Sequence, residues 1–282
     1  MSGILYLCAT PIGNLEDITF RVLRTLKEVD LIAAEDTRNT IKLLNHFEIK
    51  TPMTSYHEYN KIDKAAYLVD KLANGTNIAL VTDAGTPGLS DPGEEIVRQA
   101  YAAGIQVTSL PGACACITAL TLSGLSTRRF AFEAFLPTDK KERKAILDSL
   151  KTETRTTIIY EAPHHLLSTL NELYNTIGNR DITLCRELTK LHETIQLMTI
   201  SSAIEYYNEN PPKGEYVLVI SGRTIKELEA EKQQSWEQIS LDEHMKLYLS
   251  QGLNKKEAMK KVATDRGISK RDVYQALLKD NE

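Results

Sequence analysis

Residues 81–93, VTDAGTPGLSDPG, place three glycines, two prolines and two aspartates at the end of the apolar run NIALV. Glycines let backbone N–H and C=O groups approach a ligand closely, and prolines stiffen that approach. The carboxylates of Asp83 and Asp91 would repel a phosphate, but they suit a cationic ligand or ribose hydroxyls. A sulfonium nucleoside such as S-adenosylmethionine offers both, so this chemistry favours it over phosphate binding.

Two more loops of this kind, ATPIGN at 9–14 and LPGACA at 110–115, also follow strand-like apolar runs. Ligands of parallel sheets bind where the strands end at their carboxyl edge, so the three loops together predict a small-molecule pocket. Neither a P-loop nor the dinucleotide fingerprint G-x-G-x-x-G occurs in the sequence. For any single loop, a simple strand-to-helix turn remains the alternative.

The elements that must position these loops alternate between strand-like and helix-like patterns. Near-continuous apolar runs separated by amphipathic helices predict a largely parallel sheet covered on both faces. The predicted strands of this first series are 4–9, 31–35, 52–57, 77–83 and 105–112, and the predicted helices are 18–30, 39–47, 64–75, 93–104 and 113–124.

The alternation breaks at LSTRRF, residues 125–130, and a second α/β series follows. We therefore expect two α/β domains with a cofactor cleft between them, and a small C-terminal helical tail. The expected limits are 1–125 for the domain with the glycine-rich loops, 130–222 for the domain that completes the cleft, and 235–282 for the tail.

Composition narrows the functional class. No apolar run of the 282 residues approaches the roughly 20 that a membrane helix needs, so we expect a cytoplasmic protein without membrane contact. Four cysteines, two of them in C-x-C without a second pair, favour reduced thiols and no metal site. The net charge of −4 does not attract nucleic acid overall, but from His244 onward nine Lys and Arg stand against five acids.

A family resemblance rests on eight blocks that occur in order between residue 3 and about residue 222. They resemble the tetrapyrrole methylase superfamily, and specifically its branch that acts on ribosomal RNA. The resemblance implies a homodimeric enzyme that uses S-adenosylmethionine to methylate the ribose 2′-oxygen of a cytidine in the decoding region of 16S rRNA, within the 30S subunit. The blocks are ATPIGNLEDIT, LIAAEDTRNT, SYHEYN, VTDAGTPGLSDPG, LPGACACITAL, IIYEAPHHL, CRELTKLHE and GEYVLVI.

The same resemblance implies which residues contact the cofactor. In this sequence Cys114 stands where small hydroxyl residues are common in the family, so any hydrogen bond there would be weaker. The residues carried over are Pro11, Asp83, Ala84, Gly85, Thr86, Leu89, Cys114, Ala115, Glu161, Leu188 and Gly214.

Methylation of a hydroxyl gains from a base that takes its proton. Our order of candidates is Asp36, then Glu187, then His57, with Glu35, Glu58 and Lys190 also near the expected cleft. For Glu35 and Asp36, capping of the next helix is an equally good explanation, and His57 is more often an ordinary loop histidine.

Contacts to RNA phosphate are expected from basic residues, although a solvated face is the commoner role of each alone. Tyr56, Tyr59 and Tyr160 could stack a flipped base or simply pack. The helix with Lys140, Lys141, Arg143 and Lys144 is a further candidate. The main RNA candidates are Arg38, Arg186 and Lys190, and six residues that we call the tail cations: Lys255, Lys256, Lys260, Lys261, Lys270 and Arg271.

Two other functions stay open at this point. One is a superfamily methyltransferase for a small molecule, such as a tetrapyrrole precursor, or for a modified protein histidine. The other is a non-catalytic RNA-binding factor of ribosome assembly. The AEDTR and RELTK blocks and the basic tail argue against the first, and the intact glycine loops argue against the second.

Overall fold

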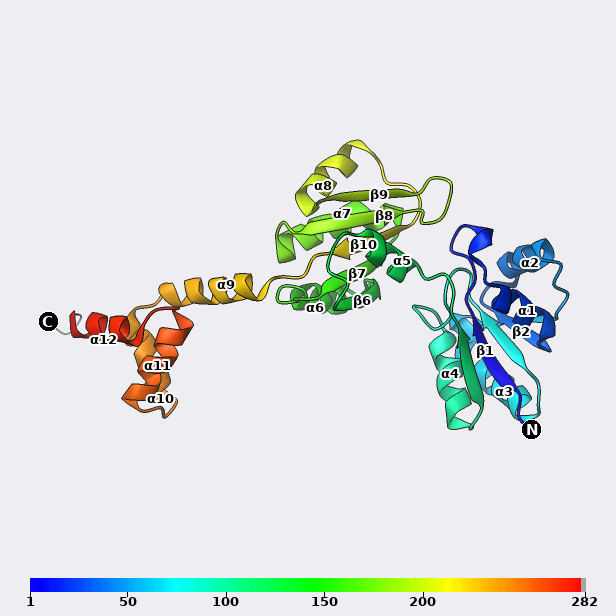
Figure 1. Ribbon diagram of the computed structural model, residues 1–282, viewed down its shortest axis with the longest axis horizontal. Coiled ribbons are helices and arrows are strands. Elements are labelled where there is room, and N and C mark those ends of the chain that lie inside the picture. Colours follow the sequence, from blue (N-terminus) through cyan, green and yellow to red (C-terminus); the bar gives the residue numbers. More distant parts are fainter. Residues whose placement is uncertain (280–282) are drawn as a thin grey trace. The chain divides into compact units, whose positions relative to one another are not determined.

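The computed structural model describes residues 1–279, which form two compact units. Residues 1–151 and 155–221 make up the first unit, and residues 152–154 join those from 222 onward in the second. The first unit contains two separate five-stranded sheets with helices around them (Figure 1). The predicted α/β fold with an additional helical tail is confirmed.

The first sheet is wholly parallel, as the apolar runs predicted. Its strand order is β3-β2-β4-β1-β5, and every neighbouring pair runs in the same direction. All four residues of β4 are buried, because helices cover both faces of the sheet. The strands are β1 (Ile4–Cys8), β2 (Leu31–Ala34), β3 (Met53–Ser55), β4 (Ile78–Val81) and β5 (Gln106–Leu110).

Two helix pairs bury opposite faces of this sheet. α1 (Phe20–Glu28) and α2 (Thr37–His46) pack through residues such as Leu26 and Leu44 against one face. α3 (Lys61–Ala73) and α4 (Gly93–Ala102) pack through Leu68 and Ile96 against the other. This arrangement leaves the carboxyl edge of the sheet to the loops, where two short 3₁₀ helices, Leu15–Asp17 and Glu58–Asn60, also lie.

The second sheet is mixed, with the order β6-β7-β10-β8-β9. Only β6 and β7 are parallel, and the other neighbours are antiparallel. One face packs against α5 (Ala115–Leu122), and the other against α6 (Lys140–Ser149), α7 (Pro163–Ile177) and α8 (Ile200–Glu209). The sequence did not predict α8. The strands are β6 (Phe130–Phe135), β7 (Thr156–Glu161), β8 (Asp181–Arg186), β9 (Thr194–Thr199) and β10 (Tyr216–Ile220).

The second unit is helical. α10 (Leu241–Ser250), α11 (Lys255–Asp265) and α12 (Lys270–Lys279) pack around a small core of buried residues that includes Met245 and Val262. α9 (Ile225–Glu237) occupies a polar stretch for which the sequence predicted no helix, and a capping box of Thr224 and Glu227 starts it. No helix within residues 1–279 is long and apolar enough to cross a membrane.

Candidate functional site

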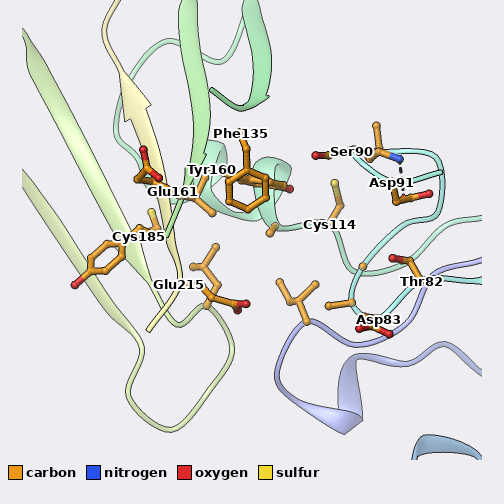
Figure 2. A pocket seen from close by; sticks show the side chains of 18 of the residues that line it. Thr82, Asp83, Ser90, Asp91, Cys114, Phe135, Tyr160, Glu161, Cys185 and Glu215 are labelled. Carbon is orange, nitrogen blue, oxygen red and sulfur yellow. Dashed lines mark hydrogen bonds between the residues drawn. The ribbon is translucent and has the colours of Figure 1, made fainter. Parts of the chain in front are cut away.

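A pocket of about 560 Å³ lies in the first unit, at the carboxyl edge of the first sheet. Figure 2 shows Thr82, Asp83, Ser90 and Asp91 on one side, residues of the second sheet on the other, and Cys114 between them. The lining residues are Ile12, Glu35, Thr82, Asp83, Ala84, Gly85, Thr86, Leu89, Ser90, Asp91, Cys114, Ala115, Phe135, Tyr160, Glu161, Ala162, Pro163, Cys185, Glu187, Leu188, Lys190, Glu215, Tyr216 and Val217.

The glycine loop after β4 is held by its own aspartate. The Asp91 carboxylate accepts hydrogen bonds from the backbone N–H groups of Gly88 at 2.8 and 2.9 Å, of Leu89 at 3.2 Å and of Gly93 at 2.7 Å. The carboxylate is therefore committed to shaping the loop and orienting the start of α4. The sequence had grouped Asp91 with Asp83 as a group that suits a cationic ligand, and the structure separates the two.

The loop after β4 is also tied to the loop after β1. Thr10 and Gly85 exchange two backbone hydrogen bonds, Thr10 N to Gly85 O at 2.9 Å and Gly85 N to Thr10 O at 3.1 Å. Gly85 has a φ of +86°, in a region that residues with a Cβ rarely adopt, and this position requires its glycine. Thr86 adds a hydrogen bond from its hydroxyl to the carbonyl of Ala113 in the third loop, at 2.9 Å. All three glycine-rich loops thus meet.

Carboxylates gather where β2 and β4 end. The Glu35 Oε2 atom accepts from the Thr82 hydroxyl at 2.6 Å and from the Asp83 N–H at 3.2 Å. The Asp83 carboxylate in turn accepts from the Asp36 N–H at 3.2 Å and from the Asn39 side-chain amide at 3.1 Å. Glu35 and Asp83 line the pocket, so this wall carries negative charge.

Asp36 stands beside that wall as the N-cap of α2. Its carboxylate accepts hydrogen bonds from the N–H and the guanidinium of Arg38, with the shortest guanidinium contact at 2.7 Å. The Arg38 side chain, followed by the Arg38 backbone N–H, lowers the pKa of Asp36 to about 2. A carboxylate with so low a pKa is a weak base.

The opposite wall contains a charged cluster around Glu187. Its Oε1 atom accepts from the Glu215 N–H and from the Lys190 ammonium, both at 2.9 Å, and Lys190 also reaches Glu215 at 2.8 Å. The Glu215 N–H, then Lys190, hold the pKa of Glu187 below its usual value. A Cβ on Gly214 would lie 2.6 Å from the Glu187 side chain, so this glycine makes room for the cluster.

The loop after β1 reaches this second wall directly. Asn14 N donates to the Thr189 hydroxyl at 3.0 Å, and a Cβ on Gly13 would lie 2.4 Å from the Lys190 side chain and 2.9 Å from the Leu188 carbonyl. Close packing of these loops joins the two sides of the pocket.

Aromatic and buried groups complete the second wall. The Tyr160 hydroxyl accepts from the Cys116 N–H at 3.1 Å, and the Phe135 ring contacts the Tyr160 ring edge-on at 5.5 Å. Glu161 is almost fully buried, and its carboxylate accepts from the Thr169 hydroxyl at 2.5 Å. Burial of this carboxylate is offset by that hydrogen bond and by one from the Ala162 N–H.

Backbone strain is concentrated at the same place. Within residues 1–279, five residues other than glycine have a positive φ, and four of them lie in or next to the pocket lining: Ser90, Ala134, Glu187 and Thr189. Such conformations cost about 1–3 kcal/mol each and persist where the surroundings enforce them, often at functional sites.

The structure brings together most of the cofactor residues that the resemblance implied. Pro11 and Gly214 do not line the pocket, but each directly precedes a residue that does. The implied residues in the lining are Asp83, Ala84, Gly85, Thr86, Leu89, Cys114, Ala115, Glu161 and Leu188, and the catalytic candidate Glu187 and the RNA candidate Lys190 join them.

Other candidates lie outside the lining. His57 is next to Asn60, whose side-chain amide Nδ2 donates to the ring Nε2 at 3.3 Å, and the buried His57 Nδ1 has no hydrogen-bond partner among the described residues. Tyr56 is a core residue whose hydroxyl donates to the Pro92 carbonyl at 2.8 Å, whereas Tyr59 is exposed. Arg186 donates to the His192 carbonyl at 3.2 Å.

The remaining basic candidates differ in whether their side chains are bonded within the protein or exposed to solvent. Arg143 of α6 is engaged by Glu172 at 2.6 Å and by the Thr169 hydroxyl at 2.8 Å. The tail cations belong to α11 and α12 of the second unit, and all six are exposed to solvent.

Several lining residues were not assigned to the cofactor from the sequence: Ile12, Thr82, Ser90, Phe135, Ala162, Pro163, Cys185, Glu215, Tyr216 and Val217. Thr82 and Ile12 belong to the glycine loops, so their place at strand ends was a usable signal. Among residues 1–279 there is no group of three or more His, Cys, Asp or Glu placed to hold a metal ion.

Comparison with known proteins decides the family. The sequence profile of the Tetrapyrrole (Corrin/Porphyrin) Methylases matches residues 5–204. The chain belongs to this family. Among its relatives, "Ribosomal RNA small subunit methyltransferase I" of Halalkalibacterium halodurans is 50% identical over 272 residues, covering 96% of this chain and 93% of the relative. The protein of the same name from Bacillus subtilis is 49% identical over 274 residues, covering 97% and 94%.

Solved structures support the fold of this family member. Diphthine synthase matches with a TM-score of 0.59 at 14% identity, covering 78% of this chain and 90% of that one. Uroporphyrin-III-C-methyltransferase from Thermus thermophilus matches with a TM-score of 0.55 at 19% identity, covering 77% and 94%. At such identities the likeness shows the tetrapyrrole methylase fold and nothing about the acceptor.

Proposed function

We propose that this protein is an S-adenosylmethionine-dependent methyltransferase that acts on small-subunit ribosomal RNA. The observation that carries the proposal is the near full-length similarity, at about half identity, to relatives named ribosomal RNA small subunit methyltransferase I. The pocket formed by three glycine-rich loops supports it, since a pure RNA-binding factor has little need for such a pocket.

The residues present fit S-adenosylmethionine. When bound, this cofactor supplies a methyl group on a cationic sulfur. The carboxylates of Glu35 and Asp83 on one wall suit its positive charge and its ribose hydroxyls. Backbone groups of Ala84 and Thr86, which flank Gly85 in the pocket lining, are available to an adenine edge. The exposed Phe135 ring, packed on the half-buried Tyr160, gives an apolar wall.

For the acceptor we propose the ribose 2′-oxygen of a cytidine in the decoding region, as the family resemblance implies. Placing this oxygen in line with the methyl group supplies much of the rate. Asp36 and Glu187 both have lowered pKa values and fixed ion-pair partners, so we assign them positioning roles. Glu35 lines the pocket, and its hydrogen bonds from the described residues all go to its Oε2 atom. We therefore propose its carboxylate as the proton acceptor.

We further propose that the tail cations, with Arg38 and Arg186, contact the RNA backbone, and that the enzyme works in the cytoplasm as a homodimer on the assembled subunit. Exposed lysines and arginines on α11 and α12 support the first point. The family resemblance supports the cytoplasmic location, the homodimer and the assembled subunit as substrate. We also propose that the two α/β domains meet between residues 125 and 130, as the break in the sequence pattern indicates.

Methyl transfer tests the function directly. Small subunits from cells that lack this protein are incubated with it and labelled S-adenosylmethionine, and the rRNA is digested and mapped by mass spectrometry. The proposal expects label on one ribose 2′-oxygen in the decoding region. Label on a base would overturn the acceptor chemistry, and no transfer with intact cofactor binding would overturn the RNA substrate in favour of a small-molecule acceptor.

A further inference from the structure

Two thiols lie side by side at the start of α5, and one of them lines the pocket. The Sγ atoms of Cys114 and Cys116 are 3.4 Å apart and share a hydrogen bond. Cys114 is half-buried and is the N-cap of α5. Its side chain is one of those that line the pocket (Figure 2). Cys116 is buried behind it, with 3% of its surface exposed. The pair therefore has one accessible and one protected sulfur.

The surroundings make the two sulfurs chemically different. The Cys116 thiol, and then the N–H groups of Ile117 and Cys116 at the start of α5, lower the pKa of Cys114 from 9.0 to about 6. The same contact and burial raise the pKa of Cys116. Thiolates are the reactive form of cysteine, and Cys114 is also the thiol that the pocket exposes, so Cys114 is the better nucleophile of the two. By contrast, burial raises the pKa of Cys8 to about 12, which leaves that thiol inert.

We propose that Cys114 and Cys116 form an oxidisable dithiol that a hydroperoxide converts to a disulfide in the pocket wall. The Cys114 thiolate attacks the peroxide, the O–O bond breaks, and sulfenic acid forms at Cys114 while an alkoxide or hydroxide leaves and takes up a proton. The Cys116 sulfur then attacks the sulfenic sulfur, forming the S–S bond and breaking the S–O bond. Its proton leaves with the hydroxide as water. Two thiols are oxidised by two electrons, and one peroxide is reduced.

The step requires little movement. A disulfide has an S–S length of about 2.05 Å, so the sulfurs must approach by roughly 1.4 Å from their separation. Cys114 is extended, with φ −149° and ψ 108°, and lies just outside the helix, so its side chain can turn without unwinding α5. A disulfide between residues 114 and 116 would close a short, strained ring, so we expect a thiol reductant to reduce this disulfide readily.

Disulfide formation would change the pocket through two contacts. It draws the Cys114 sulfur toward Cys116 and away from the lining. It also shifts the start of α5, where the Cys116 N–H donates to the Tyr160 hydroxyl at 3.1 Å. Both Cys114 and Tyr160 line the pocket, so ligand affinity falls on oxidation. This last consequence rests on the proposed function for the identity of the ligand, whereas the thiol chemistry does not.

The thiol chemistry is tested first, on the full reduced chain treated with hydrogen peroxide at a limiting dose. After denaturation and alkylation with iodoacetamide, trypsin releases residues 99–128 with both cysteines, while Cys8 and Cys185 fall in separate peptides. We expect the 99–128 peptide to lose two hydrogen atoms and resist alkylation, with Cys8 fully alkylated. Alkylation of both thiols, or sulfinic acid at Cys114 without a disulfide, would overturn the proposal.

Matched variants identify the roles. Cys116→Ser is expected to accumulate a sulfenic acid at Cys114 that dimedone traps, because the second sulfur is missing. Cys114→Ser is expected to leave Cys116 unoxidised at the same dose. If Cys116 is oxidised in Cys114→Ser at the wild-type rate, Cys116 is the sulfur that attacks the peroxide, and the proposed role of Cys114 is wrong.

Calorimetric titration with S-adenosylmethionine then measures the consequence. We expect peroxide to weaken binding to the wild-type chain at least several-fold, dithiothreitol to restore it, and peroxide to leave the affinity of Cys114→Ser where it was. Equal affinity of the reduced and disulfide forms would refute the link to the pocket. Absence of binding by the reduced chain would instead count against the proposed cofactor, while the peptide result stands separately.

Discussion

Asp91 offers a quantitative test of how the glycine loop is built. In Asp91→Ala three backbone N–H groups lose their acceptor. Gly93 is buried, so its N–H has no access to water, and an unpaired buried donor costs about 1–3 kcal/mol. Gly88 is half-buried and adds a smaller loss, whereas water replaces the bond at the exposed Leu89.

Together these losses amount to about 3 kcal/mol of unfolding free energy. For a unit of roughly this size, that corresponds to a Tm lower by about 6–12 °C. The loosened loop must also be reordered on binding, so we expect S-adenosylmethionine affinity to fall by about tenfold. Asp91→Asn keeps one oxygen and should lose about half as much stability.

Thermal unfolding followed by circular dichroism gives the first quantity, and calorimetric titration gives the second. The matched control is Asp83→Ala, which removes a carboxylate from the same loop. Asp83 is exposed and accepts from two surface groups, so its loss should weaken cofactor binding while the Tm changes by less than about 2 °C. An equal drop in Tm for both variants, or an unchanged Tm for Asp91→Ala, would refute the assignment of a structural role to Asp91.

Three further outcomes are expected. Gly13→Ala should cost about 1–3 kcal/mol of stability and weaken cofactor binding, because its Cβ would lie 2.9 Å from a backbone carbonyl; Gly104→Ala, where a Cβ meets nothing within 4 Å, should spare binding. His244 is buried and accepts from Arg266 at 3.2 Å, and burial, then Arg266, lower its pKa below 6.5. Its folded-state pKa lies below the unfolded value, so it contributes stability to the helical unit above pH 6.5 that is lost as pH falls through the folded pKa. The chain's single tryptophan, Trp236, stacks on this ring at 3.9 Å, so its fluorescence should change over that range, and a flat signal would contradict the coupling. Reversing the charge of the four α11 lysines, Lys255, Lys256, Lys260 and Lys261, should weaken binding to small subunits and flatten its salt dependence by about one unit per lost phosphate contact, without affecting cofactor binding. Unchanged affinity across salt concentrations would remove the tail from the RNA site.

The sequence was most informative where structure is local. Strand runs followed by glycine loops predicted the parallel first sheet and the meeting of the three loops at its edge, because parallel strands bring their carboxyl ends together. The sequence did not distinguish the role of Asp83 from that of Asp91. The two are the same residue type in one loop, and their roles depend on which backbone N–H groups each carboxylate faces after folding.

The second wall was harder to predict because it depends on long-range pairing. Cys185, Tyr216 and Val217 reach the pocket because β10 inserts between β7 and β8, an order that no local pattern specifies. α9 was missed for a different reason: it is polar on nearly every side, so its sequence lacks the apolar stripe that marks a packed helix.

Different interactions hold the two walls of the pocket, and this difference predicts how cofactor affinity depends on salt. The first wall is held by hydrogen bonds, without an ion pair among its described lining residues: the backbone bonds of Thr10 with Gly85, and those that the Glu35, Asp83 and Asp91 carboxylates accept from N–H and hydroxyl groups. The second is held by the ion pairs of Lys190 with Glu187 and Glu215, on a backbone strained at Glu187 and Thr189. Partly exposed ion pairs weaken with salt, whereas hydrogen bonds to backbone N–H groups are much less affected. Rising ionic strength should therefore loosen the Glu187 side first, and cofactor affinity should fall with salt less steeply in Lys190→Met, where the pairs are already absent.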